Sequence, residues 1–166
     1  MDGYNIINAW QNLKDMAEEN LEFAREALTQ TLAECKGVLW EEIVLVFDAY
    51  HKKSKGSKLF VDGIWIIYTK EGETADEVIE SLVYKLVADE EVEVATSDWQ
   101  EQRVVMGKGA LRLPAKELEE RIIQFKAELR RDYLNKNNYK SNKTSLGNFM
   151  NEKTFKELER FRKKGK

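Results

Sequence analysis

The stretch Ile43-Val44-Leu45-Val46-Phe47, followed directly by Asp48, decides the fold of this chain. A continuous apolar run of this length predicts a β-strand buried on both faces. A second such run follows at residues 64–68, a third strand is predicted at residues 92–95, and residues 74–87 between them carry apolar side chains at helical spacing. Buried strands that alternate with amphipathic helices predict an α/β fold in three layers, with a mainly parallel sheet of four to five strands and helices on both faces.

Helices are also predicted on either side of these strands. The apolar stripe at Leu13, Ala17, Leu21, Ala24, Leu28, Leu32 and Cys35 predicts one long amphipathic helix, with Gly37 as its stop. Cys35 lies on that stripe, which favours a core residue over a nucleophile. Pro114 suits the first turn of a further helix, whose stripe is Leu118, Ile122, Phe125, Leu129 and Tyr133.

The remaining segments are polar. Residues 51–58 form a basic run that predicts a flexible loop, residues 135–148 lack periodicity and predict a linker, and residues 152–164 predict a short final helix. We therefore expect one domain over residues 1–134. Residues 135–166 would be a basic linker and C-terminal helix that packs on the domain or extends it.

The charge distribution suggests a polyanionic partner. Residues 128–166 hold 12 Lys and Arg against 5 Asp and Glu, a net charge of +7, so the rest of the chain holds −10 of the overall −3. A basic segment beside an acidic body favours contact with a polyanion, although a lysine-rich solvated helix would look the same. A single cysteine, no apolar run that could span a bilayer and no signal-peptide pattern at the start favour the cytoplasm.

Aspartates fall where the predicted strands end. Asp48 follows the first strand, Asp98 follows the third, and Asp76 lies at the start of the helix after the second. Ligand sites in parallel α/β sheets lie beyond the carboxyl ends of the strands. If Asp2 ends a further strand, all these carboxylates converge. Clustered carboxylates repel one another unless they bind a proton or a cation, so the arrangement predicts a site for Mg²⁺ or Mn²⁺.

A structural role for the same acids is the alternative. The segments Thr74-Ala75-Asp76-Glu77 and Ser97-Asp98-Trp99-Gln100 both match the helix capping box. Acids in the first turn of a helix are also favoured by the helix dipole. Asp76 and Asp98, taken singly, fit that role, and the metal site depends on several acids meeting at the strand ends.

Read together, several segments resemble the YacP-type NYN-domain family of the PIN-like nuclease superfamily. The segments are Asp2-Gly3-Tyr4-Asn5-Ile6-Ile7-Asn8-Ala9-Trp10, Val46-Phe47-Asp48-Ala49-Tyr50, Tyr68-Thr69-Lys70-Glu71-Gly72-Glu73-Thr74-Ala75-Asp76-Glu77, Ala95-Thr96-Ser97-Asp98-Trp99-Gln100-Glu101-Gln102 and Gly107-Lys108-Gly109-Ala110 with Arg112. The resemblance implies a PIN-like fold and metal-dependent cleavage of single-stranded RNA. Relatives in the family act as endoribonucleases on messenger RNA in association with the ribosome.

The resemblance also implies roles for individual residues. Asp2, Asp76 and Asp98 would be the catalytic metal ligands. Asn5 and Asp48 would support these ligands. Glu101 would support the ligands without binding the metal itself, and Arg112 would contact phosphate. In the family an apolar strand precedes the Asp-Gly-Tyr-Asn motif, and here only Met1 does. We therefore expect the true start to lie upstream of Met1, and an in-frame stop codon directly before Met1 would refute this.

The resulting hypothesis is an endoribonuclease in which the acids hold one or two Mg²⁺ or Mn²⁺ ions, and a water activated by the metal attacks the phosphorus in line. Lys52, Lys53, Lys55 and Lys58, with the C-terminal basic residues, would attract RNA or the ribosomal surface. One rival is a module that binds RNA or ribosomes without cleavage. A second is a receiver-like domain phosphorylated on Asp48, but we find no lysine at the end of a final strand to support it.

Overall fold

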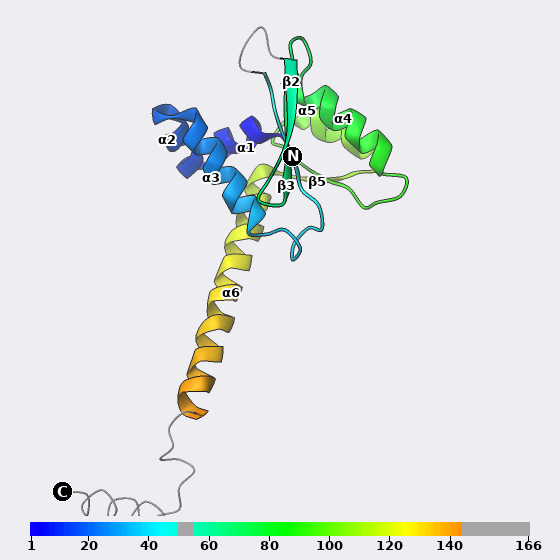
Figure 1. The fold of residues 1–166 in the computed structure, drawn as a ribbon. Coiled ribbons are helices and arrows are strands. Elements are labelled where there is room, and N and C mark those ends of the chain that lie inside the picture. Colours follow the sequence, from blue (N-terminus) through cyan, green and yellow to red (C-terminus); the bar gives the residue numbers. More distant parts are fainter. Residues whose placement is uncertain (50–54, 144–166) are drawn as a thin grey trace, which may run out of the picture. The chain divides into compact units, whose positions relative to one another are not determined.

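The fold is that of a computed structural model, which describes residues 1–49 and 55–143, except for the side chains of residues 99–102 and 135–143. The elements, in order, are α1 (Gly3–Ala9), α2 (Gln11–Glu19), α3 (Leu21–Ala33), β1 (Val44–Phe47), β2 (Lys55–Val61), β3 (Ile64–Lys70), α4 (Ala75–Leu86), β4 (Glu93–Ala95), α5 (Trp99–Gly107), β5 (Leu111–Leu113) and α6 (Ala115–Lys143) (Figure 1). The chain divides into two compact units, Met1–Ile122 and Ile123–Lys166. The first unit holds all five strands.

The strands form a mixed arrangement, so the prediction of one mainly parallel sheet of four to five strands is wrong. In one sheet, in the order β1-β3-β2, β1 runs parallel to β3 and β2 runs antiparallel to it. The other sheet holds only β4 and β5, which are parallel. The antiparallel strand arises because Asp62 and Gly63, both with positive φ, turn β2 directly into β3 as a hairpin.

The first two residues join these sheets. The N-terminal ammonium of Met1 donates to the carbonyl of Val44 at 2.9 Å, and the amide of Val46 donates to the carbonyl of Met1 at 2.9 Å. The amide of Asp2 donates to the carbonyl of Ala95 at 3.1 Å. Met1 and Asp2 thus lie between β1 and β4 and pair with both, although Asp2 and Val46 form only an isolated parallel bridge. This pairing fixes Asp2 beside the ends of both strands.

One face of the β1-β3-β2 sheet is covered by α1 and α3, and α2 packs against both of these helices (Figure 1). The predicted single helix over residues 13–35 is wrong, because the chain bends at Asn20, which has φ of −157°. The side chain of Asn20 accepts the amide of Glu22 at 2.9 Å, so this residue ends α2 and caps α3. The apolar stripe survives the break: Leu28, Leu32 and Cys35 are fully buried, and Cys35 is a core residue as predicted.

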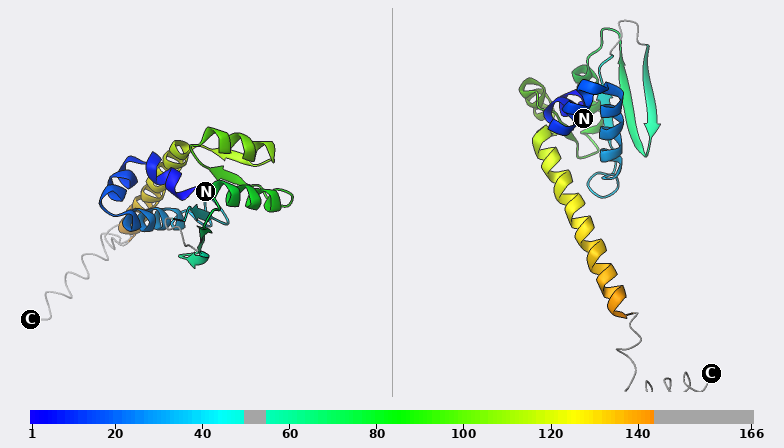
Figure 2. Two further views of the ribbon diagram at one scale, coloured as in Figure 1. Left: turned by 90° about the horizontal axis from the view of Figure 1, so that it is seen from above. Right: turned by 90° about the vertical axis from the view of Figure 1, so that its left-hand side faces the viewer.

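The opposite face is covered by α4 and α5, and Figure 2 shows the two helical layers from other directions. Val46 of β1 packs there with Ile79 and Val83 of α4, Val94 of β4 and Val105 of α5. The predicted strands at 43–47, 64–68 and 92–95 and the helix at 74–87 are thus confirmed to within a few residues. Helices on both faces are confirmed as well.

Two predicted loops need correction. Residues 55–58 belong to β2 rather than to a basic loop, and residues 50–54 lie outside the described part of the chain. Residues 135–143 continue α6 rather than forming a linker. The predicted final helix at 152–164 also falls outside the described residues.

Pro114 immediately precedes α6, as expected of a helix start, and the indole of Trp10 donates to the Ala115 carbonyl at 2.7 Å there. None of the described helices is both long and apolar enough to cross a bilayer.

Candidate active site

Asp2 is the most enclosed acid of the candidate site. Its side chain is only 9% exposed, and it caps α1 by accepting the amide of Asn5 at 3.0 Å. Burial raises the pKa of Asp2 above its ordinary value, and the negative charge of Asp48 raises it further. The bond from Asn5 and the nearby N-terminal ammonium lower the pKa, but they do not cancel the effect of burial. Asp2 is therefore a carboxylate whose charge is incompletely compensated in the folded chain.

Asp76 lies in the first turn of α4, where capping is carried out by its neighbours. The hydroxyl of Thr74 accepts the Glu77 amide at 3.2 Å, and the Glu77 carboxylate accepts the Thr74 amide at 3.1 Å, which completes the predicted capping box. Burial raises the pKa of Asp76, and the charges of Asp2, Asp98, Asp48 and Glu80 raise it further. A helix N-terminus alone would lower the pKa of a carboxyl. Burial and, after it, the neighbouring acids therefore outweigh the effect of the helix N-terminus on Asp76.

Asp48 holds the end of β1 against the start of α4. Its carboxylate accepts the amide of Ala75 at 2.5 Å, and the amide of Ala49 donates to the hydroxyl of Thr69 at 2.8 Å. The carboxyl end of β1 is thereby tied to the carboxyl end of β3 and to the N-terminus of α4. Asp48 is exposed, and it supports the arrangement of the other acids by fixing the helix that carries Asp76.

Asp98 is placed by the loop that follows β4. The amide of Ser97 donates to the side-chain oxygen of Asn5 at 2.7 Å, and the amide of Asp98 donates to the hydroxyl of the buried Thr96 at 3.1 Å. Asn5 thus connects the segment of Asp2 to that of Asp98, which is a supporting position. The predicted capping box at Ser97 is wrong, because α5 begins at Trp99 and Asp98 directly precedes it.

The four aspartates act on one another through their charges without forming a closed centre. Within the described residues, no three His, Cys, Asp or Glu side chains form a group that could hold a metal ion as they stand. The side chain of Glu101 is not among those the structure describes, so its predicted role stays untested.

An aromatic and arginine cluster beside Asp2 was missed from the sequence. The guanidinium of Arg25 donates to the Tyr4 hydroxyl at 2.9 Å, pairs with Glu22, and lies 5.7 Å from the centre of the Tyr68 ring. Phe47 packs between the two tyrosines, with ring centres 5.0 Å from Tyr4 and 5.6 Å from Tyr68. Burial raises the pKa of both tyrosines, although Arg25 opposes it. Tyr4 stands in the Asp-Gly-Tyr-Asn segment, but no sequence signal marked Arg25.

The predicted RNA-binding residues do not share one location. Lys52 and Lys53 lie outside the described residues. Lys55 and Lys58 project from β2, and Arg112 is an exposed residue of β5. Arg112 lines a cavity of about 450 Å³ with Glu93, Met106, Gly109, Ala110 and Leu111. None of the four aspartates lines that cavity, so Arg112 and the aspartates do not share this pocket.

Comparison with known proteins identifies the family. The family described as "YacP-like NYN domain" matches residues 1–163. The uncharacterized protein YacP of Bacillus subtilis (strain 168) is 43% identical over 120 residues, which are 71% of this chain and 70% of that protein. The crystal structure of Rae1 (YacP) from Bacillus subtilis has a TM-score of 0.69 at 36% identity, and the match covers 98% of this chain and 92% of that one. A mutant form of that protein gives a TM-score of 0.67 at 38% identity, over 78% of this chain and 77% of the other. The chain therefore belongs to the YacP-like NYN domain family.

Proposed function

We propose that this chain is a cytoplasmic, metal-dependent endoribonuclease that cleaves single-stranded RNA, with messenger RNA at the ribosome as its substrate. Membership of a nuclease-type family supports cleavage rather than the phosphate acceptance of a receiver-like domain. In this proposal residues 1–134 form a PIN-like nuclease domain and residues 135–166 are its basic extension. The observation that carries the proposal is that Asp2, Asp48 and Asp98 lie near enough to Asp76 for their charges to add to the effect of burial in raising its pKa.

The donor chemistry fits Mg²⁺ or Mn²⁺. Asp2, Asp76 and Asp98 offer carboxylate oxygens, which are the ligands these hard cations prefer. Burial, and after it the charges of neighbouring acids, raises the pKa of Asp2 and of Asp76, and a dication would stabilise the charged form of both. When bound, such an ion lowers the pKa of a coordinated water and stabilises negative charge on phosphate oxygens. We propose these three aspartates as the ligands.

The chain's own residues position this site. Asn5 holds the loop of Asp98 near the segment of Asp2, through the bond to the Ser97 amide. Asp48 holds the N-terminus of α4, and with it Asp76, against the end of β1. Lys55 and Lys58 would attract the RNA backbone, and in this proposal Arg112 contacts phosphate and Glu101 supports the ligands. Each of these groups orients the acids or the substrate, and the acids bind the ion.

The substitution Asp76→Asn tests the proposal. We expect cleavage of single-stranded RNA to fall by at least about a hundredfold, because a ligand oxygen and its charge are lost, while RNA affinity stays within about twofold. Asp89→Asn is the matched control, since Asp89 is an exposed acid outside the cluster. Ribosome-bound messenger RNA should be tested beside naked RNA. Equal cleavage by wild type and Asp76→Asn would instead support a module that binds RNA or ribosomes without cutting.

Metal binding has an independent readout in thermal stability. With Mn²⁺ at a hundred times its dissociation constant, linkage gives about 2.7 kcal/mol, which raises the Tm of a chain of this size by about 5–10 °C. Asp76→Asn should remove most of that increase, and Asp89→Asn should retain it. A wild-type Tm that does not respond to Mn²⁺ or Mg²⁺ at millimolar concentration would contradict the metal site.

A further inference from the structure

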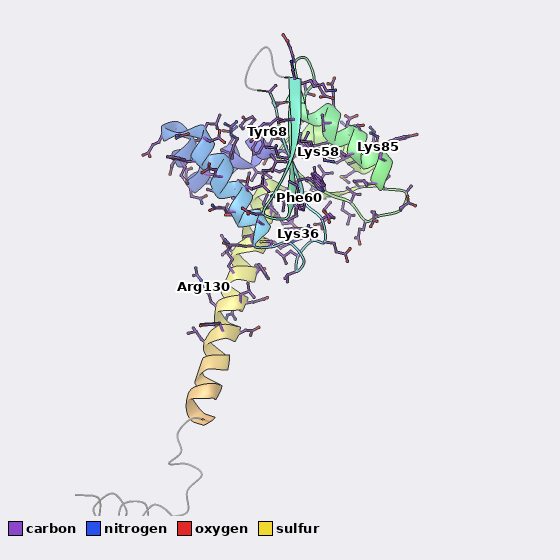
Figure 3. The ribbon with its side chains drawn as sticks, viewed as in Figure 1. Lys36, Lys58, Phe60, Tyr68, Lys85 and Arg130 are labelled. Carbon is purple, nitrogen blue, oxygen red and sulfur yellow. The ribbon has the colours of Figure 1, made fainter. Side chains whose placement is uncertain are left out.

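Two rings and two lysines lie together at the β2–β3 hairpin and are here called the aromatic–lysine patch: Lys58 and Phe60 of β2, Trp65 of β3, and Lys36 from the segment after α3. Lys58 and Phe60 are exposed, whereas Lys36 and Trp65 are half-buried. Phe60 and Trp65 stand directly opposite each other in the antiparallel register, with ring centres 4.7 Å apart. The ammonium of Lys58 lies 4.1 Å from the centre of the Trp65 ring, and that of Lys36 lies 5.3 Å from the centre of the Phe60 ring. Figure 3 labels Lys58 and Phe60 on β2 and Lys36 near them.

The patch is unusual in both its exposure and its charge. Phe60 is 55% exposed, so the fold does not use most of its apolar surface. Lys36 also donates to the Gly63 carbonyl and pairs with Glu42 at 3.5 Å, which holds its ammonium near the Phe60 ring. Residues 1–127 carry a net charge of −10, so attraction of a polyanion to this part of the chain depends on local lysines such as Lys36 and Lys58.

An exposed ring, Phe60, beside a half-buried ring, Trp65, with ammonium groups next to both, matches the chemistry of single-stranded nucleic acid. Bases stack on aromatic rings, and lysines neutralise the phosphates that connect the bases. An exposed cation over a ring is a weaker contact than a stacked base. An incoming base can therefore displace Lys58 from the Trp65 ring, and the displaced ammonium can then pair with the adjoining phosphate.

The hairpin also leads from the patch toward the aspartates. β3 runs parallel to β1, and Thr69 lies four positions after Trp65, a distance of about 13 Å along a strand. The Thr69 hydroxyl accepts the amide of Ala49, next to Asp48. Near that end Lys55 and Lys70 face each other directly across the strands. Like charges at directly opposite positions destabilise a hairpin, and a bound phosphate would relieve their repulsion.

We infer that the aromatic–lysine patch is a subsite for single-stranded RNA, which stacks bases on Phe60 and Trp65 and directs the strand along β3 to the aspartates. This inference rests on the proposed function, since it takes RNA to be the substrate. The structural alternative is that the same residues only stabilise the hairpin and shield the β2 edge. Pairing of that edge with a second copy of the chain is the competing use of the surface.

The test is binding of the full-length protein, in EDTA so that cleavage does not interfere, to a fluorescent oligoadenylate of about twelve nucleotides. We expect Phe60→Leu, which keeps apolar volume but removes the ring, to weaken binding about tenfold. Phe23→Leu is the matched control, because Phe23 on α3 is 58% exposed and lies outside the patch. On an abasic oligomer of the same length the two variants should bind equally, since no base can stack.

Lysine substitution gives a separate signature. Lys58→Gln should reduce the slope of log affinity against log salt concentration by about 0.7, the value for one phosphate contact on a single strand. Phe60→Leu should leave that slope unchanged, because it removes no charge. Near-ultraviolet circular dichroism and Tm measured for each variant separate a binding defect from loss of fold.

Specific results overturn the inference. Equal affinity of wild type and folded Phe60→Leu for oligoadenylate excludes stacking at the patch, as does an equal loss of affinity on the abasic oligomer. Self-association that Phe60→Leu abolishes, with RNA affinity unchanged, assigns the surface to a second copy of the chain. If the wild type binds no RNA, the subsite is refuted, and the cleavage assay on Asp76→Asn decides the proposed function separately.

Discussion

At the scale of single residues, the role of Asp76 depends on its neighbours in the fold. Its position after Thr74 fits a helix-capping sequence, yet Thr74 and Glu77 make the capping bonds themselves. The pKa of Asp76 is raised by burial and by the other aspartates, so the folded chain disfavours its charged form. A charge that the fold disfavours is retained where function requires it, which supports a ligand role at this position.

The raised pKa gives a prediction about stability in the absence of metal. Because the folded pKa of Asp76 lies above the unfolded value, its contribution to stability is present at low pH and is lost as pH rises through the folded pKa. Asp76→Asn in EDTA should therefore have a higher Tm than wild type at pH 7, and the difference should shrink as pH falls below the ordinary value of 3.8. Thermal denaturation from pH 3 to pH 8 measures this effect. A lower Tm for the variant at pH 7 would contradict the mutual repulsion of the acids.

At the scale of elements, the closest packing near the site is that of α1 against β1. Gly3 is buried, and a Cβ at this position would collide with the ring of Phe47. α1 begins at Gly3, directly after Asp2, and the Phe47 ring packs between Tyr4 and Tyr68. The absence of a side chain at position 3 is therefore what lets the helix start so close to the strand.

Gly3→Ala should destabilise the chain by about 1–3 kcal/mol through overpacking, even though alanine is favoured over glycine within helices by about 1 kcal/mol. Gly107→Ala in α5 is the control, because a Cβ there meets nothing within 4 Å. In urea denaturation, Gly3→Ala should lower the free energy of unfolding, and Gly107→Ala should raise it or leave it nearly unchanged. Equal or greater stability of Gly3→Ala would mean that α1 can move away from β1 at no cost.

At the scale of the whole molecule, affinity for RNA depends on charge that is unevenly spread. The chain has a formal charge of −3, so general attraction to RNA is absent and binding must use local groups of lysines and arginines. Four lysines in and before β2, namely Lys52, Lys53, Lys55 and Lys58, are the candidates nearest the hairpin in sequence. Their contacts would release counter-ions from the RNA backbone.

Salt titration of the full chain checks this view. If four phosphates are contacted, the slope of log affinity against log salt is about −2.8, and a rise from about 50 to 200 mM salt weakens binding about fiftyfold. Replacing all four lysines with glutamine should remove most of that dependence, and replacing Lys14 and Lys85, two exposed lysines of α2 and α4, should not. Affinity that stays flat over this range would exclude an electrostatic contact of this size.

Local patterns were sufficient for much of the fold. Continuous apolar runs identified β1 and β3, the short segment at residues 92–95 identified β4, and the capping box with helical spacing identified α4, because burial and local hydrogen bonding act over a few residues. β2 could also have been found, since Asp62-Gly63 between Val61 and Ile64 is a strong hairpin signal. The break at Asn20 was missed because an apolar stripe does not reveal a polar residue that caps the following helix.

The sequence alone determined which residues are chemically capable, and the resemblance of its motifs determined the family. Tertiary structure decided how those residues meet. Only the fold shows that the backbone of Met1 and Asp2 pairs with Val44, Val46 and Ala95, and that the charges of three aspartates act on Asp76. The physical reason is that electrostatic repulsion and strand pairing depend on distance in space, whereas spacing along the chain records only local periodicity.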